Sequence, residues 1–238
     1  MNHFKRASAI LLTALCATGP ALATHLSDIP WDWHPHAPYV GADLQERQMN
    51  YKRGYGDNLL KNTSVQGNFY AGMKMRENTA IEFGYEVTKT KSRVATLYAG
   101  DMAAGGIVLS GSSPAVFRSA ATVKGPHLDL VGFHGFAKNP DFKLFGSVGL
   151  GIFRAGFQRE TVQVGTIGSG PNRVLSKNKP VIRFAGGAQY MLNKHLGTRL
   201  SLGWTNTSNV VARVGDGTTL IFKPKDTTFC GLGLLWVF

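Results

Sequence analysis

Eight charged residues stand at alternate positions within otherwise apolar or glycine-rich segments, and their chemistry is that of buried ion pairs. They are Asp43, Arg47, Lys74, Glu82, Glu86, Lys143, Arg183 and Arg199. Alternate side chains of a β-strand share one face, so the eight are predicted to face a common enclosed space. Because an isolated ion there would be very costly, acids and bases must meet. Such a network either fills and stiffens the space or gates the passage of ions.

A nucleophile and a metal site are the other chemistries that the residue types suggest, and neither is complete. Asn206-Thr207-Ser208-Asn209 is similar to the His-x-Ser-Asn stretch of a lipid A deacylase, but Asn206 replaces the His that would activate Ser208. His34 and His36 form a His-x-His pair, with His25 nearby. Two ligands in an extended, proline-containing segment do not complete a metal site. We therefore predict no catalytic residue, no metal and no cofactor.

The N-terminal region has the three parts of a secretory signal peptide. Lys5 and Arg6 precede an apolar run over Ala9–Ala17, and Ala21-Leu22-Ala23 is a small-residue cleavage site. Residues 1–23 are therefore predicted to be cleaved off during export.

The exported chain is basic and has a single cysteine. Without the two basic residues of the signal peptide, the 26 basic residues fall to 24, against 14 acidic ones, a net charge of +10. Cys230 is then the one cysteine, so no internal disulfide is expected. Residues 24–38 are predicted to form a periplasmic leader whose Trp31 and Trp33 rest at the membrane surface.

Alternation between apolar and polar residues predicts β structure. The exported chain has no apolar run of 18 residues, which excludes membrane-spanning helices, and the 29 glycines of the full sequence disfavour helices in general. The clearest alternation lies in Val65–Arg76 and Ala80–Thr90, which predict a hairpin. A three-residue loop, Glu77-Asn78-Thr79, would place Lys74 opposite Glu82.

Six further segments bring the number of predicted strands to eight. They cover residues 39–49, 127–137, 142–153, 181–192, 198–207 and 228–238. The parity breaks in the middle of residues 127–137, where we predict a β-bulge. The connections alternate between a few residues and long polar or glycine-rich stretches, which places short turns at one end and long loops at the other. The pattern indicates an all-β domain over residues 39–238, a closed eight-stranded antiparallel transmembrane β-barrel of up-and-down topology.

Four motifs are similar to those of the small outer-membrane barrels, the group of OmpA-like, OmpX-like and opacity proteins. They are the "PYVGADL" opening strand, the "NFYAGMKMRENTAIEFGYEV" hairpin, the "LFGSVGLGIF" strand and the closing aromatic residue. The resemblance extends from Ala37 to Phe238 and implies the outer membrane of a Gram-negative bacterium. It departs from full-length OmpA-like proteins because no periplasmic domain follows the barrel, so no peptidoglycan tether is expected.

The last strand ends in Trp236-Val237-Phe238. Trp236 and Phe238 share the face predicted to meet lipid near the periplasmic interface, where aromatic residues gather. This ending is similar to the C-terminal assembly signal of outer-membrane proteins. The resemblance implies recognition by the barrel-assembly machinery.

The long loops carry more than half of the excess positive charge. Over residues 50–64, 92–123, 160–179 and 209–223 there are ten basic and four acidic residues. Because basic clusters bind anionic lipid head groups, the loops are predicted to contact lipopolysaccharide phosphates. The residues concerned are Lys52, Arg53, Lys61, Arg118, Arg173, Lys177, Lys179 and Arg213. Nucleic acid, another partner of such charge, is not expected for an exported chain.

The loop over residues 92–123 is 32 residues long and unusually apolar. Loops of this length are usually functional or disordered. Three interpretations stay open: a contact for a host or phage ligand, a lid over the barrel mouth, or strands that continue beyond the membrane.

These features predict a non-enzymatic outer-membrane barrel that supports the cell envelope and presents loops for recognition or adhesion, with at most a small pore. A channel for small solutes is the first alternative. A lipid A-modifying enzyme is the second, weakened by the missing base beside Ser208.

Overall fold

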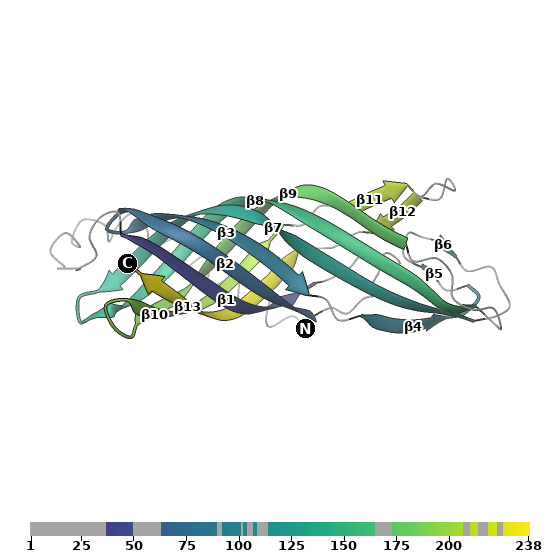
Figure 1. Cartoon of the computed structure of the whole chain (residues 1–238), viewed down its shortest axis with the longest axis horizontal. Coiled ribbons are helices and arrows are strands. Elements are labelled where there is room, and N and C mark those ends of the chain that lie inside the picture. Colours follow the sequence, from purple (N-terminus) through teal and green to yellow (C-terminus); the bar gives the residue numbers. More distant parts are fainter. Residues whose placement is uncertain are drawn as a thin grey trace.

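The computed structural model describes a chain built from β-strands (Figure 1). It describes residues 37–49, 63–89, 92–100, 102–103, 107–108, 114–164, 173–206, 210–213, 219–222 and 226–238. The strands are β1 (Pro38–Gln48), β2 (Thr63–Arg76), β3 (Thr79–Lys89), β4 (Arg93–Leu97), β5 (Met102–Ala103), β6 (Ile107–Val108), β7 (Ala115–Phe136), β8 (Asn139–Val164), β9 (Arg173–Met191), β10 (Leu196–Thr205), β11 (Val210–Arg213), β12 (Thr219–Phe222) and β13 (Thr227–Val237). Within these ranges no helix is long and apolar enough to cross a membrane.

Eight of these strands close into a ring by antiparallel pairing. Their order around the ring is β3-β2-β1-β13-β10-β9-β8-β7, and pairing of β3 with β7 closes it. Each strand of the ring therefore lies beside its predecessor in the chain, and the first pairs with the last. The predicted eight-stranded up-and-down barrel is confirmed. β4 continues along the edge of β7 beyond the end of β3, as a ninth strand outside the ring.

The β2–β3 hairpin has the predicted faces but not the predicted register. Its turn contains two residues, Glu77 and Asn78, and a register shift lies between Lys74 and Arg76. Lys74 consequently lies opposite Ala80 rather than opposite Glu82. A shift by two residues leaves every side chain on its own face. The apolar pattern therefore could not distinguish the two registers.

The bulge predicted in the middle of residues 127–137 is wrong. β7 pairs with β3 without any shift, and its ladder with β8 shifts in this region only between Gly135 and Phe136, next to the turn. The inward and outward positions of β7 alternate along its whole length. The apolar parity breaks for another reason: Val131 and Phe133 face inward, into an apolar part of the interior.

Strands β7, β8 and β9 are much longer than predicted and extend past the other five strands of the ring at one end of the barrel (Figure 1). In this extension the pattern inverts. Phe117, Ala121 and Val123 of β7 are buried, whereas Arg118 and Lys124 are exposed. A sheet with this pattern meets water on its outer face. Of the three interpretations of residues 92–123, continuing strands are therefore what the structure shows for residues 115–123.

The interior has three layers. Near the short turns lies the lower apolar cluster, formed by Tyr39, Tyr70, Ala80, Val131, Phe133, Phe145, Met191, Leu235 and Val237. Toward the extension lies the outer apolar cluster, formed by Met49, Leu97, Ala115, Phe117, Ala121, Val123, Phe153, Phe157 and Val181. Between these two clusters lie most of the buried charged and amide-bearing side chains, and we refer to this part of the interior as the charged layer. An eight-stranded barrel is narrow enough for side chains to fill it in this way.

Gly125 provides a test of the close packing between β7 and β8. A Cβ atom at this position would overlap the carbonyl oxygen of Ile152 and lie 2.8 Å from the Cα of Phe153. Both are backbone atoms, so they cannot move without distorting the ladder. Gly125→Ala is expected to lower the free energy of unfolding by about 1–3 kcal/mol, which would be measured as a lower urea midpoint. At Gly132 a Cβ would meet nothing nearer than 3.9 Å, so equal losses in Gly125→Ala and Gly132→Ala would contradict this account.

Candidate functional site

All eight charges predicted to face an enclosed space are buried inside the ring. Their exposed fractions do not exceed 6%. They come from six strands, β1, β2, β3, β8, β9 and β10, so the ring itself brings them together. Burial at this level makes each charge depend on its partners, because water does not solvate it.

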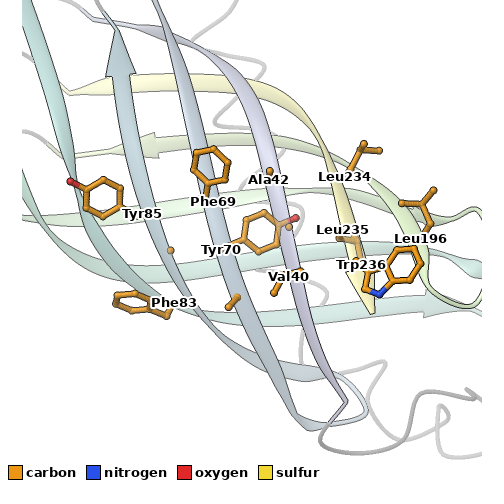
Figure 2. A pocket seen from close by; sticks show the side chains of 13 residues that line it. Val40, Ala42, Phe69, Tyr70, Phe83, Tyr85, Leu196, Leu234, Leu235 and Trp236 are labelled. Carbon is orange, nitrogen blue, oxygen red and sulfur yellow. The ribbon is translucent and has the colours of Figure 1, made fainter. Parts of the chain in front are cut away.

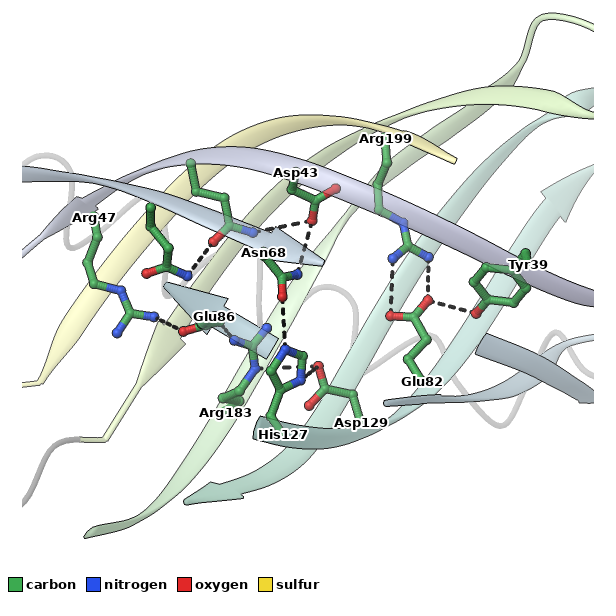
Figure 3. A network of polar contacts seen from close by, with 12 residues as sticks. Tyr39, Asp43, Arg47, Asn68, Glu82, Glu86, His127, Asp129, Arg183 and Arg199 are labelled. Atoms are coloured by element: carbon green, nitrogen blue, oxygen red, sulfur yellow. Dashed lines mark hydrogen bonds and ion pairs between the residues drawn. The ribbon is translucent and has the colours of Figure 1, made fainter. Parts of the chain in front are cut away.

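Glu82 and Arg199 form a two-pronged ion pair across the barrel (Figure 3). Arg199 donates from Nη2 to Glu82 Oε1 at 2.7 Å and from Nη1 to Oε2 at 3.1 Å. The hydroxyl of Tyr39 donates to the same Oε1 at 2.7 Å. The guanidinium carbon also lies 4.7 Å from the ring centroid of Tyr70 and 4.5 Å from that of Phe145. Aromatic faces thus hold the cation while the carboxylate neutralises it.

Glu86 lies between two arginines in the same layer. Arg47 donates from Nη2 to Glu86 Oε2 at 2.7 Å, and Arg183 contacts the other carboxylate oxygen through Nη1. Arg183 also reaches Asp129, with Nε 3.4 Å from Oδ2. Phe229 lies under both guanidiniums, at 5.7 Å from Arg47 and 5.3 Å from Arg183. One carboxylate therefore holds cations from β1 and β9 together.

A second chain of polar contacts was not predicted from the sequence. His127 Nε2 lies 3.0 Å from Asn68 Oδ1, and His127 Nδ1 lies 3.2 Å from Asp129 Oδ2. Asn68 in turn donates to Asp43 at 3.4 Å, as does Gln45 at 3.3 Å. His127 and Asp129 share one parity, and that signal was available in the sequence. The supposed bulge in this segment concealed it.

Lys74 and Lys143 are buried apart from these arginine–carboxylate pairs. They lie beside each other near the short turns, from β2 and β8. Lys74 has Ala80 and not Glu82 across the hairpin. The predicted set of eight charges is therefore divided between the charged layer and this lysine pair.

Residues singled out for metal binding or catalysis fall largely outside the described ranges. The leader with His25, His34 and His36 is not described, and neither are Ser208 and the signal peptide. Among the residues that are described, no group of three or more His, Cys, Asp or Glu side chains is placed to hold a metal ion.

The basic residues predicted for the long loops lie mostly on strands. Arg118 belongs to β7, Arg173, Lys177 and Lys179 to β9, and Arg213 to β11, whereas Lys52, Arg53 and Lys61 are outside the described ranges. Lys177 and Lys179 lie opposite Ala155 and Phe153, so they are on the inward side of the extension. The assignment of these five residues to loops is thus corrected. The sequence analysis underestimated the length of β7 and β9 and did not predict the short strand β11.

Two cations missed by the sequence analysis lie on the outward side instead. Lys124 and Arg154 are exposed and are direct neighbours across the β7–β8 ladder. They follow immediately after the outward apolar residues Leu128, Leu150 and Ile152, which are 54–66% exposed. Lys124 and Arg154 therefore mark the edge of the apolar surface on the side of the extension.

A broad outward apolar surface surrounds the ring. Leu44, Phe69, Leu150, Leu232 and Phe238 are between 62% and 67% exposed. Trp236 is 45% exposed on the same face and stacks on His195, with ring centroids 5.4 Å apart. Apolar exposure of this extent on a closed sheet with a charged interior defines a transmembrane β-barrel, because lipid replaces water around it.

The comparison with protein families identifies the particular class of barrel. The OmpA-like transmembrane domain model matches residues 36–234, and the chain belongs to this family. It is therefore a protein of the Gram-negative outer membrane. In such barrels the short turns face the periplasm and the longer connections face the outside.

Solved structures share the fold at low sequence identity. Neisserial surface protein A has a TM-score of 0.50 and 9% identity, covering 84% of this chain and 97% of that one. A major outer-membrane protein of Thermus thermophilus has a TM-score of 0.52 and 12% identity, covering 84% and 99%. The Escherichia coli outer-membrane protease OmpT has a TM-score of only 0.44 at 11% identity, covering 86% and 98%. No curated protein matches the sequence.

Proposed function

We propose that this protein is a non-enzymatic outer-membrane barrel whose filled interior closes it to solutes, and that it supports the envelope and presents its outer end for recognition. The observation that carries the proposal is the Glu82–Arg199 pair. These residues stand on β3 and β10, which are four places apart in the ring of eight. Their two hydrogen bonds therefore cross the lumen from wall to opposite wall.

The layers above and below this pair support the same conclusion. Glu86 joins Arg47 and Arg183 from two other strands, and the lower and outer apolar clusters lie on either side of the charged layer. An ion entering this interior would have to displace paired charges and cross apolar side chains. Both steps are costly. A static network therefore accounts for the buried charges better than a conducting path does.

Conductance in planar bilayers tests the closed interior. The refolded barrel is expected to give no steady, well-defined openings, because paired charges and apolar side chains lie in the interior of the described ring. Glu82→Ala combined with Arg199→Ala removes the crossing pair and is expected to produce brief openings. Steady openings in the unaltered protein would instead establish the first alternative, a channel for small solutes.

Lipopolysaccharide is the partner that the outer surface fits best. Lys124 and Arg154 are exposed neighbours next to the apolar belt on the side of the extension, and basic residues at the edge of a membrane bind anionic lipid head groups. Two like charges that oppose each other across a ladder destabilise it, and a bound phosphate would remove that repulsion. A host or phage ligand at the extension, and the barrel-assembly machinery at Trp236 and Phe238, complete the proposed partners.

Substitution of the outer cation pair tests the lipopolysaccharide contact. Each basic residue near an anionic surface contributes about 1 kcal/mol, so Lys124→Gln with Arg154→Gln is expected to weaken lipopolysaccharide retention by about 30-fold. The measurement is binding of purified lipopolysaccharide to the refolded barrel. Lys138→Gln, an exposed lysine in the β7–β8 turn at the opposite end, is the matched control. Equal retention by all three proteins would exclude this contact.

A further inference from the structure

The barrel wall has a hollow whose lining includes the outward side chains of Phe69, Phe83 and Trp236 (Figure 2). Its volume is about 580 Å³, within the range of about 300–1,000 Å³ for small-ligand sites. The small side chains Ala42 and Ala71 lie between the large ones of Phe69, Phe83 and Trp236. Because neighbouring positions differ so much in size, the otherwise convex wall is recessed here.

The hollow rises from the periplasmic rim into the apolar belt. It crosses β10, β13, β1, β2 and β3, which are successive neighbours in the ring. At one end Leu196 is the first residue of β10, directly after a short turn. At the other end Phe83 is the fifth residue of β3, well above its turn. Barrel strands tilt by about 35–45° from the membrane normal. A path that crosses several strands therefore also rises through the membrane, and an acyl chain can follow it.

The lower end of the hollow lies next to the β9–β10 turn, which contains an aromatic ring stacked on Trp236 and one lysine. The ring of His195 stacks on Trp236 with an interplanar angle of 17°. His195 Nδ1 donates to the carbonyl of Val237 at 3.0 Å, because a carbonyl oxygen only accepts. The turn that leads into Leu196 is Leu192-Asn193-Lys194-His195, which contains one lysine and no acid. Lys194 is exposed there.

We propose that this hollow is a binding site for one phospholipid with an anionic head group. One acyl chain lies in the hollow between Phe83 and Trp236, and the phosphate lies at Lys194. The occupant follows from two observations: the hollow is lined by outward apolar side chains of the lipid-facing surface, and the turn that carries the exposed Lys194 leads directly into Leu196 at the periplasmic end of the hollow. A second copy of this chain could cover the apolar part, but its apolar belt would place no anion at Lys194.

Native mass spectrometry of the refolded full chain in detergent tests the site. The probes are dioleoylphosphatidylglycerol and dioleoylphosphatidylcholine, added separately at equal concentration. The protein is expected to retain one lipid, with the anionic probe held about fivefold more tightly, as one lysine near an anionic group provides. A protein without retained lipid, or a dimer in place of the lipid adduct, would overturn the proposal.

Two pairs of variants locate the bound lipid. Ala71→Leu fills the hollow and is expected to abolish retention of both probes. Ala188→Leu adds the same atoms to the outward face of β9, outside the hollow, and is expected to retain them. Lys194→Gln is expected to remove the preference for the anionic probe, whereas Lys138→Gln keeps it. Heat-modifiable migration confirms that each variant folds, and identical retention in Ala71→Leu and Ala188→Leu would refute the assignment.

Discussion

Glu86→Ala is expected to destabilise the barrel by about 3–5 kcal/mol, the loss typical of removing one partner from a buried ion pair. Glu86 is fully buried and contacts Arg47 and Arg183 through its two carboxylate oxygens. The substitution leaves both guanidiniums inside the ring without this carboxylate. Phe229 continues to face both cations, but a ring face does not neutralise a full charge.

The measurement for Glu86 is reversible urea unfolding in detergent or lipid vesicles. Glu86→Gln is a second variant, which keeps the size and hydrogen-bonding capacity of the side chain but removes its charge, so it is expected to be nearly as unstable. Glu46→Ala is the matched control, because Glu46 is exposed on β1. Should Glu86→Gln equal the unaltered protein in midpoint, hydrogen bonding alone would hold the arginines and the electrostatic account would be wrong.

The second large effect concerns the pair that crosses the lumen. Glu82→Leu or Arg199→Met alone is expected to cost about 3–5 kcal/mol, since each leaves an uncompensated buried charge. Together the two substitutions are expected to cost far less than the sum, because Met and Leu can pack against Tyr70 and Phe145. Replacing a buried ion pair with apolar residues is often neutral.

A double-mutant cycle measures this coupling. Tyr39 donates to Glu82, so loss of the carboxylate also leaves a buried hydroxyl without its acceptor, at a cost of about 1–3 kcal/mol. The cycle is therefore carried out in a Tyr39→Phe background, which removes that contribution from every arm. Additive costs for the two substitutions would show that Glu82 and Arg199 do not act as a pair.

Strand alternation made the barrel and its polar interior predictable. The period of two residues places Asp43 and Arg47 of β1 on one face whatever the partner strand is, and it places Leu44 on the other. A local property of the chain thus assigned each side chain to the lumen or to lipid. The length of β7 was not predictable in this way. In the extension the outer face is no longer in lipid, so apolar residues such as Phe117 occupy inward positions and polar residues occupy outward ones.

By itself, the sequence determined the eight strands of the ring, the closed membrane-spanning sheet and the inward position of the charges, because these depend on alternation along single segments. Only the tertiary structure decided which charges meet. Glu82 pairs with Arg199, 117 residues away in the chain, and not with Lys74 across its own hairpin. Register can shift by two residues without changing any face, and contacts across a lumen depend on ring closure. Neither property is encoded in the local pattern of any one strand.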